Sequence, residues 1–202
     1  MERGGRPKGS TKKRKAIYQR EYDLFVNRLM NDPHVSDFRK ERTRKAVCLL
    51  FNGGFRVSEL TRLTCLDICD AVFRGEISLK NDTKTRTGRN VFFSKKSREE
   101  IKRLFETEIE YCSDQLVFHG RGGSYSFVNS TSFTYQLNKL LKKHLNGNYT
   151  THSFRAGYIT EVVKDFNPKM AQAMIGHKSI NTTLRYTEIT EDDLKNAIED
   201  IR

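Results

Sequence analysis

Apolar side chains recur at helical spacing along most of this 202-residue chain. Between residues 18 and 29 they lie three or four positions apart, which predicts an amphipathic helix that ends before Pro33. The same spacing predicts further helices over 36–54, 98–110 and 131–145, the first of which ends at a glycine pair. The expected core-facing residues of that helix are Ala46, Val47, Leu49 and Leu50.

One segment breaks the helical pattern. Residues 76–80 alternate polar and apolar, and residues 89–92 do so more loosely, with a polar, Gly-containing stretch between them. This pattern predicts two short strands joined by a turn. The sequence HGRGGS at 119–124 is expected to form a loop. Because no internal repeat or second composition shift marks a boundary, we predict one α+β domain over residues 16–202, mainly α, with a small antiparallel sheet.

The charge is strongly positive, with 37 Lys and Arg against 25 Asp and Glu, a net of +12 that favours a polyanionic partner. Residues 1–15 hold seven of the basic residues and only Glu2 as an acid. Interleaved with Gly, Pro, Ser and Thr, this segment predicts a disordered basic arm. It is either a solvated tail or a DNA-binding arm, whose Gly-Arg-Pro sequence resembles minor-groove arms. The candidate DNA-binding residues are Arg3, Arg6, Lys8, Lys12, Lys13, Arg14 and Lys15.

Several protein classes are excluded by composition. The longest wholly apolar run, residues 46–51, is too short to span a bilayer, and the N-terminus lacks a signal-peptide pattern. The four cysteines are too unevenly spaced for a disulfide framework, and no second Cys or His pair follows Cys65 and Cys69 to complete a zinc site. We therefore predict free thiols, no metal, and a cytoplasmic, nucleoid-associated protein, with an organelle or viral origin left open.

The last third of the chain carries the strongest motif. His152 and Arg155 are three residues apart on an expected helix, so both side chains can meet one ligand. An Asn-Pro pair predicts the start of the next helix, which ends at Gly176, immediately before His177. Tyr186 follows nine residues later. The order His-x-x-Arg, Ile-Gly-His, Ser-Ile-x-Thr-Thr-x-x-Tyr resembles the C-terminal signature of the tyrosine recombinase, or phage integrase, family.

The resemblance extends upstream and covers roughly residues 36–202. The sequence GFRVSEL at 54–60 is similar to the first arginine motif of the family, and it contains Arg56. The family also places a lysine in the turn between its second and third strands. Lys84 occupies that place by alignment from the following strand, with Lys80 as its rival. The resemblance thus implies six catalytic residues, which are Arg56, Lys84, His152, Arg155, His177 and Tyr186.

The chemistry of the family requires these residue types. A tyrosine oxygen can store the phosphoryl group of a cleaved DNA strand covalently, so Tyr186 is the implied nucleophile. Its phenol has an ordinary pKa of about 10 and needs a proton acceptor, for which His152 is the implied base.

Charge develops on the nonbridging phosphate oxygens, and two guanidinium groups suit that geometry. The resemblance implies that Arg56 and Arg155 supply them, that His177 adds a hydrogen bond, and that Lys84 protonates the departing 5′ oxygen. Because side chains provide every cation and donor, no cofactor is required.

The N-terminus departs from the usual plan of the family. Only 55 residues precede Arg56, and the helices among them are expected to belong to the catalytic domain, so we expect no separate N-terminal DNA-clamping, or core-binding, domain. The predicted function is a site-specific recombinase that cuts and rejoins double-stranded DNA as a homotetramer on two sites. The alternatives are a type IB topoisomerase-like enzyme and a non-catalytic DNA-binding regulator of the same fold.

Overall fold

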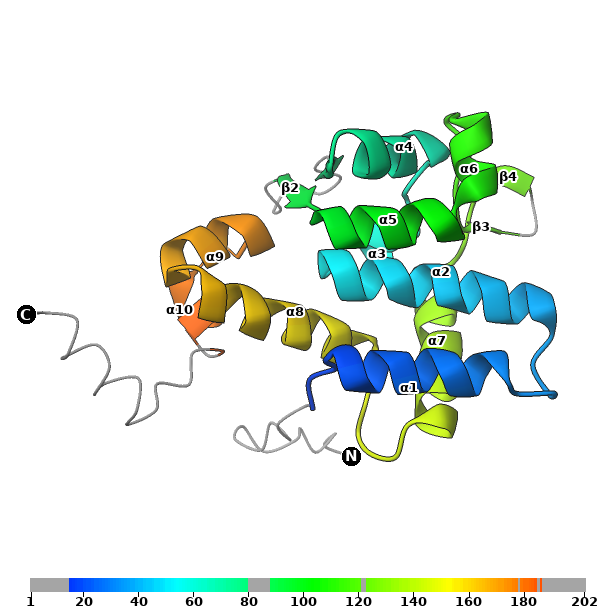
Figure 1. Cartoon of the computed structure of the whole chain (residues 1–202), viewed down its shortest axis with the longest axis horizontal. Helices are drawn as coiled ribbons and strands as arrows, with labels where there is room; N and C mark the ends of the chain where they lie inside the picture. Colours follow the sequence, from blue (N-terminus) through cyan, green and yellow to red (C-terminus); the bar gives the residue numbers. More distant parts are fainter. Residues whose placement is uncertain (1–14, 80–87, 121–122, 178, 185, 187–202) are drawn as a thin grey trace, which may run out of the picture.

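Helices make up most of the structure, which is a computed structural model describing residues 15–79, 88–120, 123–177, 179–184 and 186 (Figure 1). The helices are α1 (Gln19–Met30), α2 (Asp37–Gly53), α3 (Val57–Leu60), α4 (Cys65–Phe73), α5 (Lys95–Leu104), α6 (Glu106–Tyr111), α7 (Ser130–His144), α8 (Thr151–Asp165), α9 (Pro168–Ile175) and α10 (Ile180–Leu184). The strands are β1 (Glu76–Leu79), β2 (Arg89–Phe92), β3 (His119–Gly120) and β4 (Gly123–Phe127). The prediction of a mainly helical α+β fold with a small antiparallel sheet is confirmed.

The first two helices begin and end close to the predicted residues. Helix α2 follows Ser36 and ends at Gly54, whose φ of 56° is the left-handed conformation that glycine adopts without strain. Helix α9 begins after Asn167, whose side chain accepts a hydrogen bond from the Met170 amide at 2.9 Å. It ends at Gly176, which is also left-handed, with a φ of 69°. Two glycines therefore end the helices that lead into Arg56 and His177.

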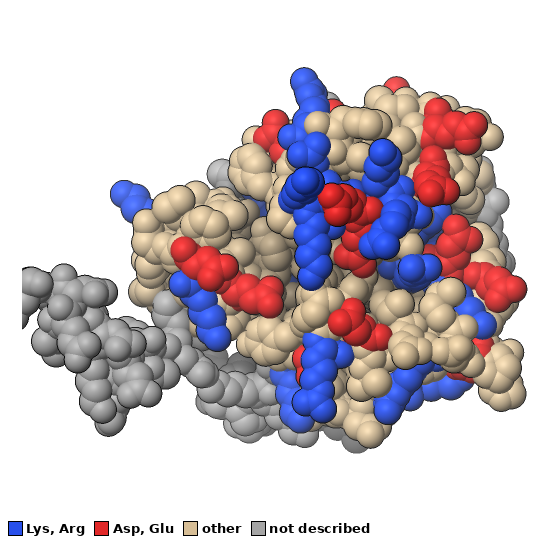
Figure 2. Space-filling view, viewed as in Figure 1, with Lys and Arg blue, Asp and Glu red and all other residues tan. Residues whose placement is uncertain are grey.

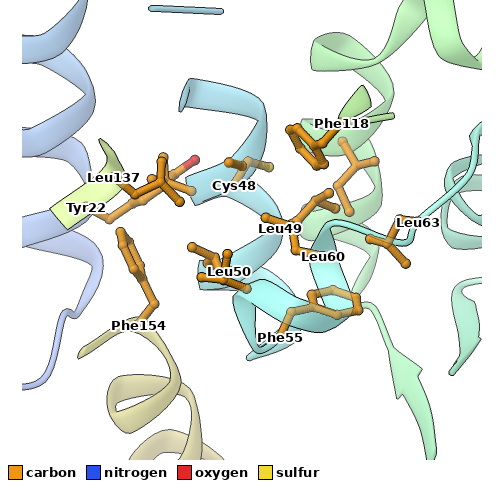
Figure 3. Close-up of a cluster of buried hydrophobic side chains, with 14 of the residues drawn as sticks. Tyr22, Cys48, Leu49, Leu50, Phe55, Leu60, Leu63, Phe118, Leu137 and Phe154 are labelled. Atoms are coloured by element: carbon orange, nitrogen blue, oxygen red, sulfur yellow. The ribbon is translucent and has the colours of Figure 1, made fainter. Parts of the chain in front are cut away.

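Helix α2 lies at the centre of the main core. Its Leu49 and Leu50 are fully buried, and Figure 3 shows them surrounded by side chains from several other helices. Among these are Tyr22 of α1, Leu60 of α3 and Phe154 of α8. The four predicted core-facing residues of α2 are all buried, which confirms the helical interpretation of this segment.

The sheets agree with the sequence at one place and differ at another. Strands β1 and β2 pair antiparallel as predicted, with Ile77 opposite Val91. The predicted loop at 119–124 is wrong in part, because β3 and β4 form a second antiparallel pair in which His119 lies opposite Phe127. Residues along β4 alternate only between exposed and half-buried positions, so the strand carries no clear apolar alternation.

Two further expectations need correction. The helix predicted over 98–110 is two helices, α5 and α6, since the chain turns at Phe105 to bury its ring completely. The prediction of free thiols is wrong for Cys69 and Cys112, which form a disulfide where α4 packs against α6. Cys48 and Cys65 are buried free thiols.

Helix α8 connects the main core to the last part of the fold. In Figure 1 it runs away from α1, α2 and α7, and it carries α9 and α10 at its far end. A small apolar cluster that includes Ile159 and Ile175 holds α9 against α8. Helix α9 also contacts β2, and α8 contacts α2. The C-terminal ends of α2 and α9 and the start of β2 therefore meet beside the N-terminal half of α8. None of the described helices has the length and apolar character needed to cross a membrane.

Candidate active site

Arg155 lies buried where α8, α2 and α9 meet. Its Nη1 donates to the carbonyl oxygen of Gly54 at 2.5 Å, and its Nη2 donates to that of Ile175 at 2.9 Å. The guanidinium therefore links the C-terminal ends of α2 and α9, both of which end at a glycine. Burial lowers the pKa of Arg155 to about 9, and the positive charges of Arg56 and Arg89 act in the same direction. The group stays cationic at neutral pH.

Arg56 directly precedes α3 and is held by Glu59 of that helix. The Glu59 carboxylate accepts from the Arg56 guanidinium at 2.7 Å and from the Arg56 backbone amide at 2.8 Å. The Arg56 side chain keeps 32% of its surface exposed, whereas that of Glu59 keeps 16%. Glu59 thus holds a guanidinium that remains partly exposed to solvent.

His177 follows α9 and is held by both backbone and side-chain contacts. Gln172 accepts from the His177 amide at 3.1 Å and donates to its carbonyl oxygen at 2.9 Å. The ring Nδ1 lies 3.0 Å from the hydroxyl of Thr183, which is fully buried in α10. Burial lowers the pKa of His177 to about 4, helped by the positive charges of Arg155, Arg56 and Arg89. The ring is therefore neutral at pH 7.

Tyr186 lies beside the same cluster. Its backbone amide donates to the carbonyl oxygen of Thr183 at 3.0 Å, and its half-buried ring packs on the α8–α9 apolar cluster with Tyr158. Its phenol interacts electrostatically with Arg155. This interaction raises the pKa of Arg155 and so opposes part of the effect of burial. The structure therefore gathers four of the six predicted residues, Arg56, Arg155, His177 and Tyr186.

Of the remaining predicted residues, the structure describes only His152 and Lys15. His152 is exposed in the first turn of α8, one turn before Arg155. Lys84 and its rival Lys80 lie outside the described residues. In the basic arm only Lys15 is described; it is exposed, with its Nζ 6.0 Å from the ring centroid of Tyr149. The remaining arm residues, Arg3, Arg6, Lys8, Lys12, Lys13 and Arg14, lie outside the described part of the chain.

The site has an excess of positive charge. Burial alone would raise the pKa of Glu59, but the charges of Arg89, Arg155 and Arg56, with the hydrogen bond from the Arg56 amide, hold it below its ordinary value. One carboxylate therefore faces three guanidinium groups. Such an excess suits an anion with several oxygens, as a phosphodiester has. Among the described residues, no three His, Cys, Asp or Glu side chains gather as metal ligands.

The side of the molecule drawn in Figure 2 carries both signs of charge close together, over α2 and α5. In α2, Lys45 pairs with Glu41 at 3.1 Å and with Glu108 of α6 at 2.9 Å, and Lys40 lies 3.7 Å from Asp37. Both of these lysines are thus paired with neighbouring carboxylates. The unbalanced cluster lies instead around Arg155.

Three residues that build the site were not predicted from the sequence. Glu59 lies in the first arginine motif but was not predicted as a site residue, yet it is the acid that faces three arginines. Thr183 orients His177, and its place in the Thr-Thr pair of the C-terminal motif was the available signal. Arg89 was predicted only as the start of a strand and not as a site residue. The alternation of β2 nevertheless indicates that its side chain points inward.

A model of the phage integrase family matches residues 20–192, so the chain belongs to this family. Among its curated relatives, tyrosine recombinase XerC of Treponema denticola is 28% identical over 164 residues, which cover 73% of this chain and 52% of the relative. Tyrosine recombinase XerA of Pyrococcus horikoshii is 28% identical over 159 residues, which cover 78% and 54%. The chain spans about half the length of these relatives.

Solved structures show the same fold. A crystal structure of XerA recombinase aligns with a TM-score of 0.67 at 18% identity, covering 93% of this chain and 65% of that one. The Tn1549 transposon integrase in complex with transposon right end DNA aligns with a TM-score of 0.71 at 20% identity, covering 96% and 68%. XerH site-specific recombinase bound to its difH substrate aligns with a TM-score of 0.67 at 19% identity, covering 91% and 53%.

Proposed function

We propose that this chain catalyses site-specific recombination of double-stranded DNA through a covalent 3′-phosphotyrosine intermediate. The observation that supports the proposal is the gathering of Arg56, His177 and Tyr186 around Arg155, in a cluster where one acid, Glu59, faces an excess of positive charge. These residues come from segments far apart in the sequence. They are also the residues that the family resemblance selects for breaking and rejoining a phosphodiester.

Tyr186 acts as the nucleophile. Its Oη attacks the scissile phosphorus, its proton passes to His152, and the bond from phosphorus to the 5′ oxygen breaks. Lys84 protonates that oxygen, which leaves a 3′-phosphotyrosine and a free 5′ hydroxyl. Attack by a 5′ hydroxyl from a second strand reverses these steps, so the energy of the phosphodiester is conserved without a nucleotide cofactor.

Arg56, Arg155 and His177 stabilise the charge that develops on the nonbridging oxygens. The two guanidinium groups supply fixed donors that are already oriented by Glu59 and by the carbonyl oxygens of Gly54 and Ile175. We assign to neutral His177 the tautomer with its proton on Nε2, in which Nδ1, 3.0 Å from the Thr183 hydroxyl, accepts from it and Nε2 donates to a phosphate oxygen. This hydrogen bond adds no further positive charge to a crowded cluster.

The proposed partner is double-stranded DNA, bound by four copies of the chain that bring two recombination sites together. Relatives of the same fold are described as integrase and recombinase bound to DNA, which supports the choice of partner. The basic residues of 1–15 neutralise phosphate groups outside the cleavage site, which raises affinity without reading sequence.

The test uses a suicide duplex, nicked close to the cleavage position and carrying the repeats that flank the gene. The short fragment between the cleavage position and the nick, which carries the free 5′ hydroxyl, dissociates after cleavage, so a covalent adduct accumulates. We expect label on the 5′ end of the cleaved strand to stay with the protein, because the 3′ phosphate is the attached end. Label on the released fragment should not remain with the protein.

Plasmid relaxation and the suicide duplex together separate the alternatives. A type IB topoisomerase-like enzyme would relax supercoiled plasmid equally well with or without the repeats. A non-catalytic regulator would bind the duplex and give no adduct. Either result would contradict the proposed recombinase function.

A further inference from the structure

Arg89 is a buried arginine beside the candidate active site, to which the resemblance assigns no role. It is the first residue of β2, and its side chain is only 5% exposed, with the guanidinium carbon 5.9 Å from the ring centroid of Phe55. A charged side chain is rarely buried to this degree unless it holds specific partners. The partners of Arg89 therefore indicate its purpose.

The guanidinium of Arg89 bridges two elements of the site. Its Nη2 donates to Oε2 of Glu59 at 3.2 Å, and its Nη1 donates to the carbonyl oxygen of Met174 at 3.3 Å. Glu59 is the acid that holds Arg56. Met174 lies in the last turn of α9, three residues before His177. A single planar group thus contacts the supports of two candidate catalytic residues.

Close packing reinforces the second contact. A Cβ atom added to Gly176 would lie 2.8 Å from Cδ of Arg89, so the arginine stem lies directly against the turn that presents His177. Nε of Arg89 is buried and has no hydrogen-bond partner among the described residues. The arginine is therefore kept at a cost in solvation, which a residue needed only for packing would not require.

We propose that Arg89 is a positioning residue that holds Arg56 and His177 at a fixed separation, acting through Glu59 on one side and the Met174 carbonyl on the other. The inference rests on the proposed recombinase function. Arg89 does not touch the phosphate. The planar fork of its guanidinium, rather than its charge, joins the two supports, and a lysine ammonium on a flexible stem cannot reproduce this geometry.

The test compares Arg89→Lys and Arg89→Met with wild type on the suicide duplex. We expect both variants to bind DNA with near wild-type affinity and to form adduct about 10- to 100-fold more slowly, the loss typical of residues that support a catalytic group. Because Glu59 carries part of the effect, the double variant Arg89→Met with Glu59→Gln should lose less than the product of the two single losses.

The matched control is Arg98→Met. Arg98 also donates to two backbone carbonyls, those of Val72 and Phe73, but it ties α5 to α4. This variant should cleave like wild type. The pKa of His177, followed by NMR, should rise in Arg89→Met, which removes one of the cations that lower it, and should change little in Arg89→Lys and Arg98→Met.

An Arg89→Lys variant that cleaves at the wild-type rate would overturn the proposal, because charge alone would then suffice. A loss of DNA affinity equal to the loss of rate would also overturn it, as would unfolding of both variants, which would make Arg89 a purely structural residue. A wild-type chain that forms no adduct would instead contradict the proposed function, and this outcome is distinguishable from the others.

Discussion

Replacement of Arg155 by methionine should remove catalysis while leaving the fold nearly as stable as before. The guanidinium donates two charge-assisted hydrogen bonds, to the carbonyl oxygens of Gly54 and Ile175. Such bonds contribute roughly 1.5–3 kcal/mol each, so their loss costs roughly 3–6 kcal/mol in the free energy of unfolding.

Burial of the cation opposes this contribution. It lowers the pKa of Arg155 to about 9. Since a tenfold change in a protonation constant is about 1.4 kcal/mol, the buried charge costs the folded state roughly 5 kcal/mol. Methionine removes this cost together with the hydrogen bonds and keeps most of the volume. The two contributions nearly cancel, and we expect a net change within about 2 kcal/mol.

The assay is urea denaturation followed by circular dichroism, alongside adduct formation on the suicide duplex. Arg155→Lys is the informative control, because lysine keeps a buried charge and lacks the fork that reaches both carbonyls. The lysine variant should be less stable than the methionine variant, and neither should form adduct at a measurable rate. A methionine variant destabilised by about 4–5 kcal/mol or more, or a lysine variant that is the more stable of the two, would refute the reasoning.

Three further predictions concern the other candidate residues. Lys84→Ala should slow cleavage by roughly 10²- to 10⁴-fold on normal DNA, and far less when sulfur replaces the 5′ bridging oxygen; equal slowing on both substrates would contradict its role as general acid. Deletion of residues 1–15 should flatten the plot of log affinity against log salt concentration by roughly three to six units, since each phosphate contact contributes about 0.9, and an unchanged slope would mean that the arm never contacts DNA. Because the pKa of His177 is about 4 in the folded chain and near 6.5 in the unfolded chain, the unfolded state binds the proton first and stability should fall as pH drops from about 6.5 to 4. His177→Gln should lessen that fall in a urea titration series, and a fall of unchanged size would place its origin in other groups.

The helices that carry a strong apolar stripe were predictable from the sequence. Helix α1 lies within a residue or two of its predicted position, and α2 begins and ends where predicted because Ser36 and Gly54 give clear signals at its two ends. The β3–β4 hairpin was missed since its outward residues, such as Tyr125 and Phe127, are aromatic and exposed, while its inward residues are serines. Its pairing is a backbone property that side-chain periodicity does not report.

The site residues that belong to a sequence motif were predictable. The residues that join the site only through tertiary contacts were not. Arg155 and His177 follow from their motif, but nothing in the sequence states that α8 brings Arg155 against the ends of both α2 and α9. The third guanidinium, Arg89, is 30 residues from Glu59, and only the packing of β2 against α9 brings it into the cluster. Contacts between distant segments depend on tertiary packing, which local patterns do not encode.

The identity of the covalently attached residue is the most direct test of the account. The adduct on the suicide duplex would be digested with nuclease and trypsin, and the phosphorylated peptide sequenced by mass spectrometry. Trypsin cleaves after Arg185, so the peptide that begins at Tyr186 contains a single tyrosine. The account predicts phosphate on Tyr186, and a Tyr186→Phe variant that binds the duplex but forms no adduct. Phosphate on another residue, or an adduct that persists in Tyr186→Phe, would contradict it.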